Sequence, residues 1–333
     1  MALLEVSDLT IRFHTPTGIV GAVRGLSFTI DQNETVAIVG ESGSGKTVTS
    51  LSILRLLAAP QAEVTGSIRF QGVNLLDLPM KDIRALRGGD ISMVFQEPMT
   101  SLNPVLTVGY QIDESLRLHQ GMTRKQARAR SIELLKIVGI PSPERRIAEY
   151  PHQFSGGMRQ RAMIAMALAC SPKLLIADEP TTALDVTIQA QVLGLMRQLR
   201  QQFGSAIMLI THDLGIVAQM ADRVIVMYAG RAVEAASVRE LFRNPRHPYT
   251  QGLLRAMPSL GGSLQSGGRQ PLNEIRGQVP SLRKPIIGCA FAPRCDRALE
   301  TCGHETPASR EIDGLHSVAC HNPVPARSLE TVP

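Results

Sequence analysis

The segment GESGSGKT at residues 40–47 has the residue types and the spacing of a phosphate-binding loop, G-x-x-x-x-G-K-[ST]. It consists of Gly40, Glu41, Ser42, Gly43, Ser44, Gly45, Lys46 and Thr47. The glycines allow backbone N–H groups to turn inward around phosphate oxygens. The Lys46 ammonium can neutralise the terminal phosphates of a nucleotide, and the Thr47 hydroxyl can ligate Mg²⁺. We therefore predict that this segment binds a nucleoside triphosphate together with Mg²⁺.

The apolar run at residues 174–177 ends in two carboxylates, Asp178 and Glu179. At the end of a strand beside the phosphate loop, Asp178 would hold Mg²⁺ directly or through water. Glu179 would orient or deprotonate an attacking water molecule. The alternative is a strand end with two solvated acids, and the nearby phosphate loop favours the catalytic interpretation.

A third unusual segment begins at Ser155, which is a typical helix N-cap residue and is followed by Gly156 and Gly157. Glycine inside a helix costs on the order of 1 kcal/mol relative to alanine. Two glycines at a helix start would let a phosphate approach the backbone closely. A helix over residues 158–170 would then point its positive end at that anion. A flexible helix start is the plainer alternative.

At these residues the chain resembles the ATP-binding-cassette (ABC) family of P-loop NTPases, whose signature is Leu-Ser-Gly-Gly-Gln. Phe154 replaces the usual leucine and Met158 replaces the usual glutamine, whereas the serine and both glycines are kept. Because the kept residues are those that face phosphate, we expect the signature to work.

The other motifs of that family follow in order within residues 1–245. Gln96 resembles the glutamine of the Gln loop, Asp185 ends an Ala-Leu-Asp sequence that resembles the D-loop, and His212 resembles the switch histidine. Phe13 resembles the aromatic residue that stacks on adenine. The resemblance implies ATP and Mg²⁺ as ligands, and a head-to-tail pair of subunits with two ATP molecules between them.

The resemblance also implies a role for each site residue. The catalytic residues would be Glu179, His212, Lys46 and Gln96. The residues that hold Mg²⁺ would be Thr47, Gln96 and Asp178. The residues that contact the partner's ATP would be Ser155, Gly156, Gly157 and Asp185.

The motifs need elements that bring them together. Short apolar runs alternate with helical stretches, which predicts a largely parallel sheet in an α/β fold. The runs are residues 35–39, 91–95, 174–178, 207–211 and 223–228. Thr123 and Gln126 form a capping-box sequence that opens a helix to about Val138. We expect an ABC nucleotide-binding domain over residues 1–245, with a helical subdomain inserted at about 97–170.

Residues 246–333 are expected to form a C-terminal cysteine-rich extension that includes a Gly/Ser-rich linker at residues 259–268. Five, six and seventeen residues separate its four cysteines, Cys289, Cys295, Cys302 and Cys320. Structural zinc usually shows a short Cys-x(2–4)-Cys pair, which this sequence lacks, and four thiolates are the usual ligands of an iron–sulfur cluster. An iron–sulfur cluster, a zinc ion and free thiols stay open as interpretations.

The composition limits the partners that the chain can have. The formal net charge is +6, there is no tryptophan, and aromatic residues make up 4% of the sequence. Base stacking is therefore an unfavourable mode of action, and we expect no nucleic acid partner. The first residues have neither the charged leader nor the apolar core of a secretion signal. The longest uncharged apolar stretch, residues 162–172, is shorter than the about 18–20 residues of a spanning helix, so a membrane role is expected only through partners.

Residues 244–250, 97–104 and 150–153 resemble the oligopeptide and dipeptide importer ATPases of the ABC family. That resemblance implies an ATP-hydrolysing subunit that powers import of dipeptides or short oligopeptides and lies on the cytoplasmic face of the inner membrane. Its partners would be a second ABC ATPase, two transmembrane permease subunits and, indirectly, an extracytoplasmic peptide-binding protein. Several such members hold a [4Fe–4S] cluster, which implies one on the four cysteines.

Three alternatives to peptide import remain open at this stage. The first is an ABC ATPase of a nickel importer or of another solute importer. The second is a soluble ABC ATPase that acts on DNA or ribosomes, although the chain lacks the long coiled-coil insertion or the second cassette of such relatives. The third is a binding module without activity, which Glu179 and His212 disfavour.

Overall fold

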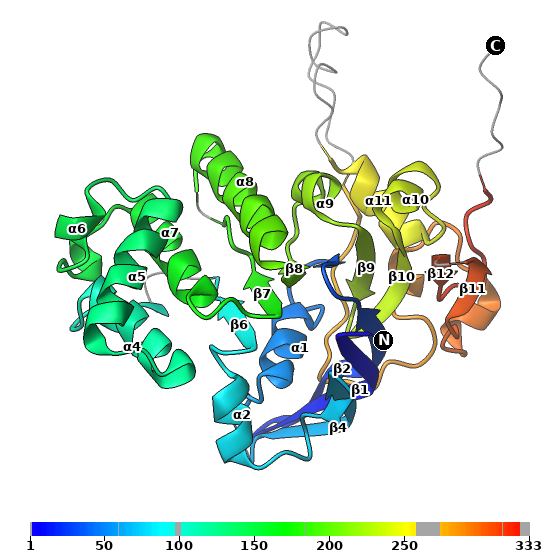
Figure 1. Cartoon of the computed structure of the whole chain (residues 1–333). Coiled ribbons are helices and arrows are strands. Elements are labelled where there is room, and N and C mark those ends of the chain that lie inside the picture. Colours follow the sequence, from blue (N-terminus) through cyan, green and yellow to red (C-terminus); the bar gives the residue numbers. More distant parts are fainter. Residues whose placement is uncertain are drawn as a thin grey trace, which may run out of the picture.

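The computed structural model describes residues 2–58, 60–96, 101–182, 184–257, 274–314 and 316–326. The predicted linker at residues 259–268 and residues 97–100 of the resemblance lie outside the described residues. Two β-sheets and a group of helices make up the described part of the chain (Figure 1).

The smaller sheet is antiparallel and contains four strands. In sheet order they are β2 (Gly18–Ile30), β1 (Leu4–Thr15), β4 (Ala62–Phe70) and β5 (Val73–Asn74). In β1, buried residues such as Leu4, Val6, Leu9 and Ile11 are separated by more exposed ones. This sheet therefore covers a core with one face, as expected for antiparallel strands.

The larger sheet has eight strands and contains the predicted apolar runs. In sheet order they are β11 (Arg310–Asp313), β12 (His316–Val318), β10 (Arg231–Ser237), β9 (Arg223–Tyr228), β3 (Thr35–Val39), β8 (Ala206–Ile210), β7 (Leu174–Asp178) and β6 (Ile91–Val94). The five strands from β9 to β6 are parallel, and β10, β12 and β11 continue the sheet antiparallel. The five predicted runs match β3, β6, β7, β8 and β9 within one residue at each end. The fold is α/β with a mixed sheet.

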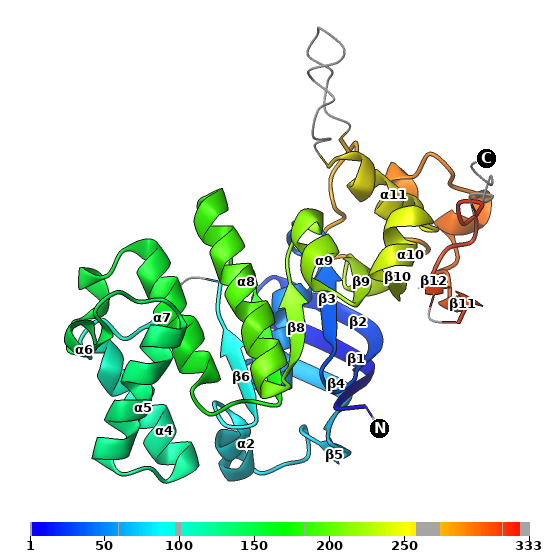
Figure 2. The ribbon, with the colours of Figure 1, turned by 45° about the horizontal axis from the view of Figure 1, so that its top comes forward.

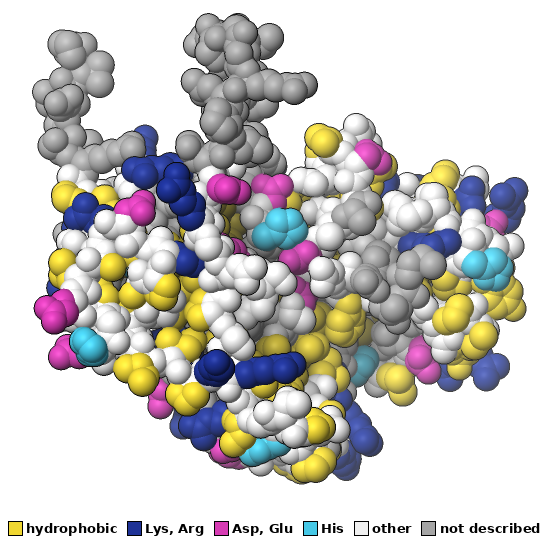
Figure 3. Space-filling view, turned by 180° about the vertical axis from the view of Figure 1, so that it is seen from behind, with side chains coloured by type: hydrophobic (Ala, Val, Ile, Leu, Met, Phe, Trp, Pro, Cys, Tyr) yellow, Lys and Arg dark blue, Asp and Glu magenta, His cyan; other side chains and the backbone are white. Residues whose placement is uncertain are grey.

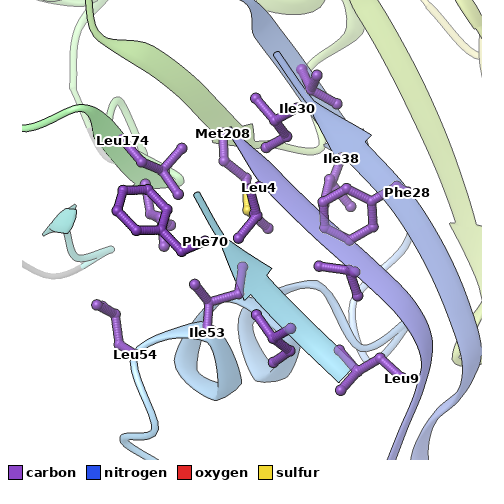
Figure 4. Close-up of a cluster of buried hydrophobic side chains, with 14 of the residues drawn as sticks. Leu4, Leu9, Phe28, Ile30, Ile38, Ile53, Leu54, Phe70, Leu174 and Met208 are labelled. Carbon is purple, nitrogen blue, oxygen red and sulfur yellow. The ribbon is translucent and has the colours of Figure 1, made fainter. Parts of the chain in front are cut away.

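The two sheets enclose the main core, part of which Figure 4 shows. Leu4 and Phe70 of the small sheet point toward Ile38, Leu174 and Met208 of the large one. Helix α1 (Lys46–Ile53) enters this core with Ile53. Because α1 follows the phosphate loop directly, the packing of α1 fixes the loop against both sheets.

Alternate residues of β7 and β8 pack into two different hydrophobic cores. Leu174 and Met208 face the small sheet, whereas Leu175 and Leu209 face helices α7, α8 and α9. These helices are α7 (Gly156–Leu168), α8 (Val186–Phe203) and α9 (Leu214–Met220). The strands are thus covered on both faces, which explains their continuous apolar sequence.

A group of helices with its own core lies at one end of the molecule (Figures 1 and 2). Its members besides α7 are α4 (Val108–Gln120), α5 (Arg124–Ile137), α6 (Pro143–Arg146) and the short helix η1 (Pro151–Gln153). The predicted capping box at the start of α5 is confirmed: Gln126 N–H donates to Thr123 Oγ1 at 3.4 Å, and Thr123 N–H donates to Gln126 Oε1 at 2.9 Å. The helix ends at Ile137, one residue before the predicted end. Helix α2 (Met80–Leu86) lies outside this group, beside the small sheet.

The C-terminal region joins the large sheet directly, because β12 pairs with β10. Its helical elements are α10 (Val238–Arg243), α11 (Pro248–Arg255), η2 (Ala292–Arg294) and η3 (Glu300–Gly303). The buried Glu234 carboxylate on β10 accepts hydrogen bonds from the backbone N–H groups of Arg246 (2.6 Å) and His247 (2.9 Å), and lies 2.8 Å from His316 Nε2 on β12. One side chain thus connects β10 to two segments of the C-terminal region.

The face in Figure 3 shows Lys and Arg side chains interspersed with Asp, Glu and hydrophobic ones. Among the helices of the described residues, none has the length and apolar character needed to span a membrane.

Replacing Glu234 with alanine is expected to destabilise the protein strongly. The change leaves two buried N–H groups and the buried His316 without their acceptor, which costs roughly 3 kcal/mol. Thermal unfolding of the full chain measures this loss. The matched control is Glu311→Ala on β11, where the exposed side chain predicts a change within about 0.5 kcal/mol. Equal melting temperatures for the two variants would contradict the role given to Glu234.

Candidate functional site

The phosphate loop connects β3 to α1, as predicted, and its glycines have backbone conformations that other residues rarely adopt. Gly40 has φ 154°, Gly43 has φ 77° and Gly45 has φ 98°. A Cβ atom on Gly40 would lie 2.2 Å from Met227 O, and one on Gly45 would lie 2.6 Å from Ala22 O. Neighbouring backbone therefore excludes side chains at both positions.

The first turn of α1 is suited to bind an anion. Its N-cap is Gly45, and no side chain among the described residues caps the helix N-terminus. The first N–H groups of the helix are therefore left for a ligand, and the helix dipole favours a negative one. These observations fit a bound phosphate.

Lys46 is buried inside the loop, with 7% of its surface exposed. Its Nζ donates to Gly40 O at 2.7 Å and to Glu41 O at 3.0 Å. Burial lowers the pKa of Lys46, while the carboxylates of Glu179 and Asp178 oppose that shift. The ammonium is thus held by two carbonyl groups in a desolvated site, where its charge acts strongly on a phosphate.

Thr47 and Asp178 place two oxygen donors side by side. Thr47 Oγ1 donates to Asp178 Oδ1 at 3.3 Å. Asp178 is 1% exposed, and burial raises its pKa although the Thr47 hydrogen bond opposes that shift. A hydroxyl and a carboxylate beside a phosphate site match the protein ligands that Mg²⁺ uses when substrate phosphates and water complete its shell.

The Glu179 carboxylate contacts three other side chains. Its Oε2 accepts hydrogen bonds from Gln96 Nε2 at 3.0 Å and from Thr182 Oγ1 at 2.9 Å, and its Oε1 lies 3.2 Å from His212 Nδ1. Its φ of 46° is a strained conformation for a residue with a side chain, and strain of this kind gathers at functional sites. Burial alone would raise the pKa of Glu179, but the hydrogen bonds from Thr182 and His212 outweigh it and hold the pKa below its ordinary value.

Topology explains why these residues meet. The strands β3, β8, β7 and β6 are neighbours and parallel, so their carboxyl ends lie at one edge of the sheet. The phosphate loop follows β3, His212 follows β8, Glu179 follows β7 and Gln96 follows β6. Ligands of α/β sheets bind at this edge.

The segment at Ser155 differs partly from its prediction. Ser155 is the N-cap of α7, and its Oγ accepts from Met158 N–H at 3.3 Å, as expected. The helix begins at Gly156, so both glycines lie in its first turn. A Cβ atom on Gly156 would meet open space, whereas one on Gly157 would lie 3.2 Å from Ile188 Cγ2. Close packing against α8 thus explains Gly157, and Gly156 is the glycine that is open to a ligand.

The structure places this segment near Asp185 but apart from the phosphate loop of the same chain. Helix α7 lies in the helical group, and α1 lies next to the sheets, apart from it in Figure 1. Asp185 is near the start of α7, because it caps α8 by accepting from Ile188 N–H at 2.9 Å and Ile188 contacts Gly157. Asp185 is exposed, and Val186 beside it is 83% exposed. Ala183 of the same motif lies outside the described residues.

Phe13 lies on β1 opposite Val20 and is half-buried at the edge of the core between the sheets. Its role in stacking on adenine stays a prediction.

Two contacts of the site were missed by sequence reasoning. Thr182 follows Glu179 by three residues, and that spacing in a turn could have indicated its hydrogen bond. The second contact is made by Arg294, which forms an ion pair with Glu41 of the phosphate loop at 2.9 Å. Because 253 positions separate the two residues, no local pattern could have indicated it.

The predicted metal site at Cys289, Cys295, Cys302 and Cys320 is wrong. In the part of the chain that the structure describes, no group of three or more His, Cys, Asp or Glu side chains could hold a metal ion, and all four thiols are free. Burial raises the pKa of Cys289 and Cys295, and raises that of Cys320 to about 11. Metals bind the thiolate, so these surroundings favour the form that does not bind. Iron–sulfur and zinc binding are therefore withdrawn, together with the idea of a cluster-bearing extension.

The same cysteines have packing roles instead. Cys289 and Cys295 pack against the core that contains Tyr249 and Phe291. Cys302 is buried, and its Sγ accepts a hydrogen bond from Leu299 N–H at 3.4 Å.

Two family models match the chain. The model described as "ABC transporter" matches residues 23–182, and the model described as "Oligopeptide/dipeptide transporter, C-terminal region" matches residues 233–302. The first match contains the phosphate loop, the segment at Ser155 and Glu179. The second contains Arg294.

Proteins of known name are similar over nearly the whole chain. The probable peptide ABC transporter ATP-binding protein y4tR of Sinorhizobium fredii is 53% identical over 96% of this chain and 94% of its own length. The oligopeptide transport ATP-binding protein OppD of Bacillus subtilis is 52% identical over 95% and 87%. The dipeptide transport ATP-binding protein DppD of Haemophilus influenzae is 49% identical over 97% and 96%.

Solved structures are similar over the larger part of the chain. The dimeric post-hydrolysis state of the ATP-binding cassette MJ0796 bound to ADP and Pi matches with a TM-score of 0.64 and 27% identity, over 71% of this chain and 99% of that one. The protein cbiO1 from Clostridium perfringens, part of the ABC transporter complex cbiONQ, matches with a TM-score of 0.60 and 28% identity, over 72% and 90%.

Removing the Thr182 hydroxyl is expected to raise the pKa of Glu179. The hydroxyl donates to the charged carboxylate, so Thr182→Val removes a contact that favours ionisation, and Glu179 would become protonated at higher pH. An NMR titration of ¹³C-labelled Glu side chains measures the shift. Thr187→Val, an exposed change on α8, is the control and should leave the titration unchanged. An unchanged curve in Thr182→Val would contradict the assignment.

Proposed function

This chain belongs to the ABC transporter ATPases of the oligopeptide/dipeptide group, and on that premise we propose that it hydrolyses ATP to power the import of dipeptides or short oligopeptides. The observation that supports the ATP site most directly is the meeting of Lys46, Thr47, Asp178 and Glu179 at the carboxyl edge of four neighbouring parallel strands. The names of the similar proteins support the peptide substrate.

Each residue of the site has a distinct task in this proposal. Bound MgATP supplies the γ-phosphoryl group that is transferred to water. Lys46 neutralises phosphate charge from its desolvated position, and Thr47 with Asp178 holds Mg²⁺. Glu179 orients the attacking water and accepts its proton on the carboxylate. Gln96, Thr182 and His212 hold that carboxylate through the contacts described above.

A low pKa suits Glu179 for orientation more than for strong basicity. The carboxylate stays ionised at neutral pH, so it is always available to accept a hydrogen bond from water. A carboxylate with a lowered pKa is a weaker base, so it removes a proton from the attacking water less readily before the bond between water and phosphorus forms. Its main contribution is therefore to position the water and stabilise charge on it as the reaction proceeds.

The segment at Ser155 is proposed to complete the ATP site of a second subunit. Gly156 is open, Asp185 and Val186 are exposed, and α7 lies apart from this chain's own phosphate loop. Two of the solved relatives are described as dimeric. We propose a head-to-tail pair with a second ABC ATPase, each subunit offering a helix N-terminus to the other's ATP.

The helical group is proposed to contact two permease subunits at the cytoplasmic face of the cell membrane. Tyr110 and Tyr150 are exposed aromatic side chains of this group, at 46% and 41%. They lie on adjacent segments, because Val108 N–H donates to Glu149 O at 3.0 Å. Phe95, also exposed, directly precedes Gln96, which donates a hydrogen bond to Glu179. An extracytoplasmic binding protein would deliver the peptide to the permeases.

Glu179→Gln is expected to retain MgATP binding and to reduce hydrolysis by at least roughly 100-fold, because a neutral amide neither stabilises the positive charge that develops on the attacking water nor accepts its proton. Lys46→Ala is expected to lose MgATP binding as well. Both are measured in the complex with its permeases, as ATPase activity and as nucleotide retained after filtration. Full turnover in Glu179→Gln would remove Glu179 from its proposed role.

Dipeptides and short oligopeptides, added with the binding protein, are expected to stimulate the ATPase activity of that complex. Nickel ions serve as the comparison, because a nickel importer would respond to them and not to peptides. A complex stimulated by nickel alone would contradict peptide import while leaving the ATP site intact.

Ser155→Arg is expected to leave this chain's own MgATP affinity unchanged but to slow hydrolysis in the assembled pair by roughly tenfold or more, since a bulky cation replaces a donor beside the partner's ATP. Binding is measured on the isolated chain and hydrolysis on the complex. Ser142→Arg is the matched control, because Ser142 is an exposed serine at the start of α6. Ser131 is buried and is therefore not used. Equal hydrolysis by both variants would oppose the shared site.

A further inference from the structure

A buried arginine of the C-terminal region contacts the phosphate loop. Arg294 ends the short helix η2, and its side chain is 5% exposed. Its Nη1 lies 2.9 Å from Glu41 Oε2, and its Nη2 lies 3.2 Å from Glu41 Oε1. Two parallel hydrogen bonds between a guanidinium and a carboxylate fix direction as well as distance.

The guanidinium is itself held in place on several sides. Nε donates to Arg276 O at 2.9 Å, Nη2 donates to Ile275 O at 3.0 Å, and Nη1 donates to Tyr228 Oη at 3.2 Å. The group also lies over the rings of Tyr228 and Phe291, at 5.8 and 5.9 Å from their centroids. Arg294 therefore cannot follow Glu41 if the loop moves; it acts as a fixed point.

Glu41 is bound through all of its polar groups. Its N–H donates to Tyr249 Oη at 2.9 Å, its carboxylate binds Arg294, and its carbonyl oxygen accepts from Lys46 Nζ at 3.0 Å. Tyr249 is buried on α11 and packs against Tyr228 and Phe291. Continuous contacts thus run from the C-terminal region through one loop residue to the lysine that faces phosphate.

The contact between Arg294 and Glu41 also has an electrostatic effect, because Glu41 is negatively charged. A carboxylate in the second position of a phosphate loop lies close to a ligand that is itself strongly negative. An unpaired anion there would repel the ligand, and the partly buried site would strengthen the repulsion. Arg294 neutralises the carboxylate and holds it in one position through the two hydrogen bonds.

We propose that Arg294 is a positioning residue of the ATP site, through which the folded C-terminal region sets the affinity of the phosphate loop for MgATP. The inference rests on the ATP binding proposed above. It adds a requirement that the phosphate-loop motif does not contain: a residue from the C-terminal region must neutralise and hold Glu41.

The test compares MgATP affinity among variants of the full-length chain. Arg294→Gln is expected to weaken MgATP binding roughly tenfold, because it leaves Glu41 charged and unanchored. The double variant Glu41→Gln/Arg294→Gln removes that charge and is expected to bind MgATP more tightly than Arg294→Gln alone. Such rescue is not expected if Arg294 only stabilises the fold. A double variant that binds no better than Arg294→Gln would overturn the charge argument.

Arg297→Gln is the matched control. Arg297 lies three positions further along, and its Nη2 donates to Asn322 Oδ1 at 3.2 Å, away from the loop. It is expected to lower the melting temperature without changing MgATP affinity. Equal weakening of MgATP binding by Arg297→Gln and Arg294→Gln would show a general effect of the region and would overturn the proposal.

Two further measurements keep the proposal testable if Arg294→Gln folds poorly. Arg294→Lys keeps the charge but cannot form both hydrogen bonds, so roughly threefold weaker MgATP binding is expected. In the assembled complex, KM for ATP should rise while kcat at saturating MgATP stays within about twofold, because Glu179 and its partners are untouched. Wild-type affinity in Arg294→Lys, or a fall in kcat alone, would overturn the proposal. Lys46→Ala tests the ATP site itself, so failure of the two ideas can be told apart.

Discussion

The parallel alignment of β3, β8, β7 and β6 is the constraint on which the site depends, because it places the ends of four distant segments at one edge of a sheet. Parallel strands require crossover connections, and here the connections contain α1, the helical group, α8 and α9. These helices bury both faces of the sheet, so the strands cannot slide relative to each other without exposing the core. Residues that are 133 positions apart, such as Lys46 and Glu179, are therefore held in one cluster by packing far from the cluster itself.

The same arrangement concentrates opposite charges in a desolvated volume. Burial lowers the pKa of Lys46 and raises that of Asp178, while each group partly offsets the shift of the other. Glu179 is less buried and more hydrogen-bonded, so its pKa moves the opposite way from that of Asp178, although the two residues are adjacent. One strand end thus carries two adjacent carboxylates whose pKa values shift in opposite directions. The left-handed φ of Glu179 supports this difference, because it directs two consecutive side chains to different neighbours.

The sequence predicts the local motifs and several elements of the fold, but not the contacts between distant segments. Apolar runs with a loop motif placed β3, β7 and β9 to the residue, and the Thr123 capping box placed the start of α5, because those signals act over a few positions. The contact of Gly157 with a phosphate stays a prediction, and its packing against Ile188 on another helix is a constraint that the sequence did not indicate. The four cysteines were interpreted as metal ligands from their number and from family resemblance, but spacing does not show which way side chains point, and burial in an apolar core favours neutral thiols. Contacts over long separations leave no periodic trace in a single sequence.

Contacts of that long-range kind tie the C-terminal region to the site. Its hairpin continues the central sheet at β10, Glu234 of β10 binds two of its segments, and Arg294 extends from it to Glu41. A region attached only by a linker could move without effect on the loop, whereas this one shares a sheet with the strands that form the site. Any displacement of η2 relative to β9 must either break a buried, bidentate ion pair or move the phosphate loop. Separating the two charges of this ion pair would leave a charge unpaired in a partly buried site, which is strongly unfavourable. Movement of the loop and movement of the C-terminal region should therefore be coupled. The ATP site is therefore built from both ends of the chain.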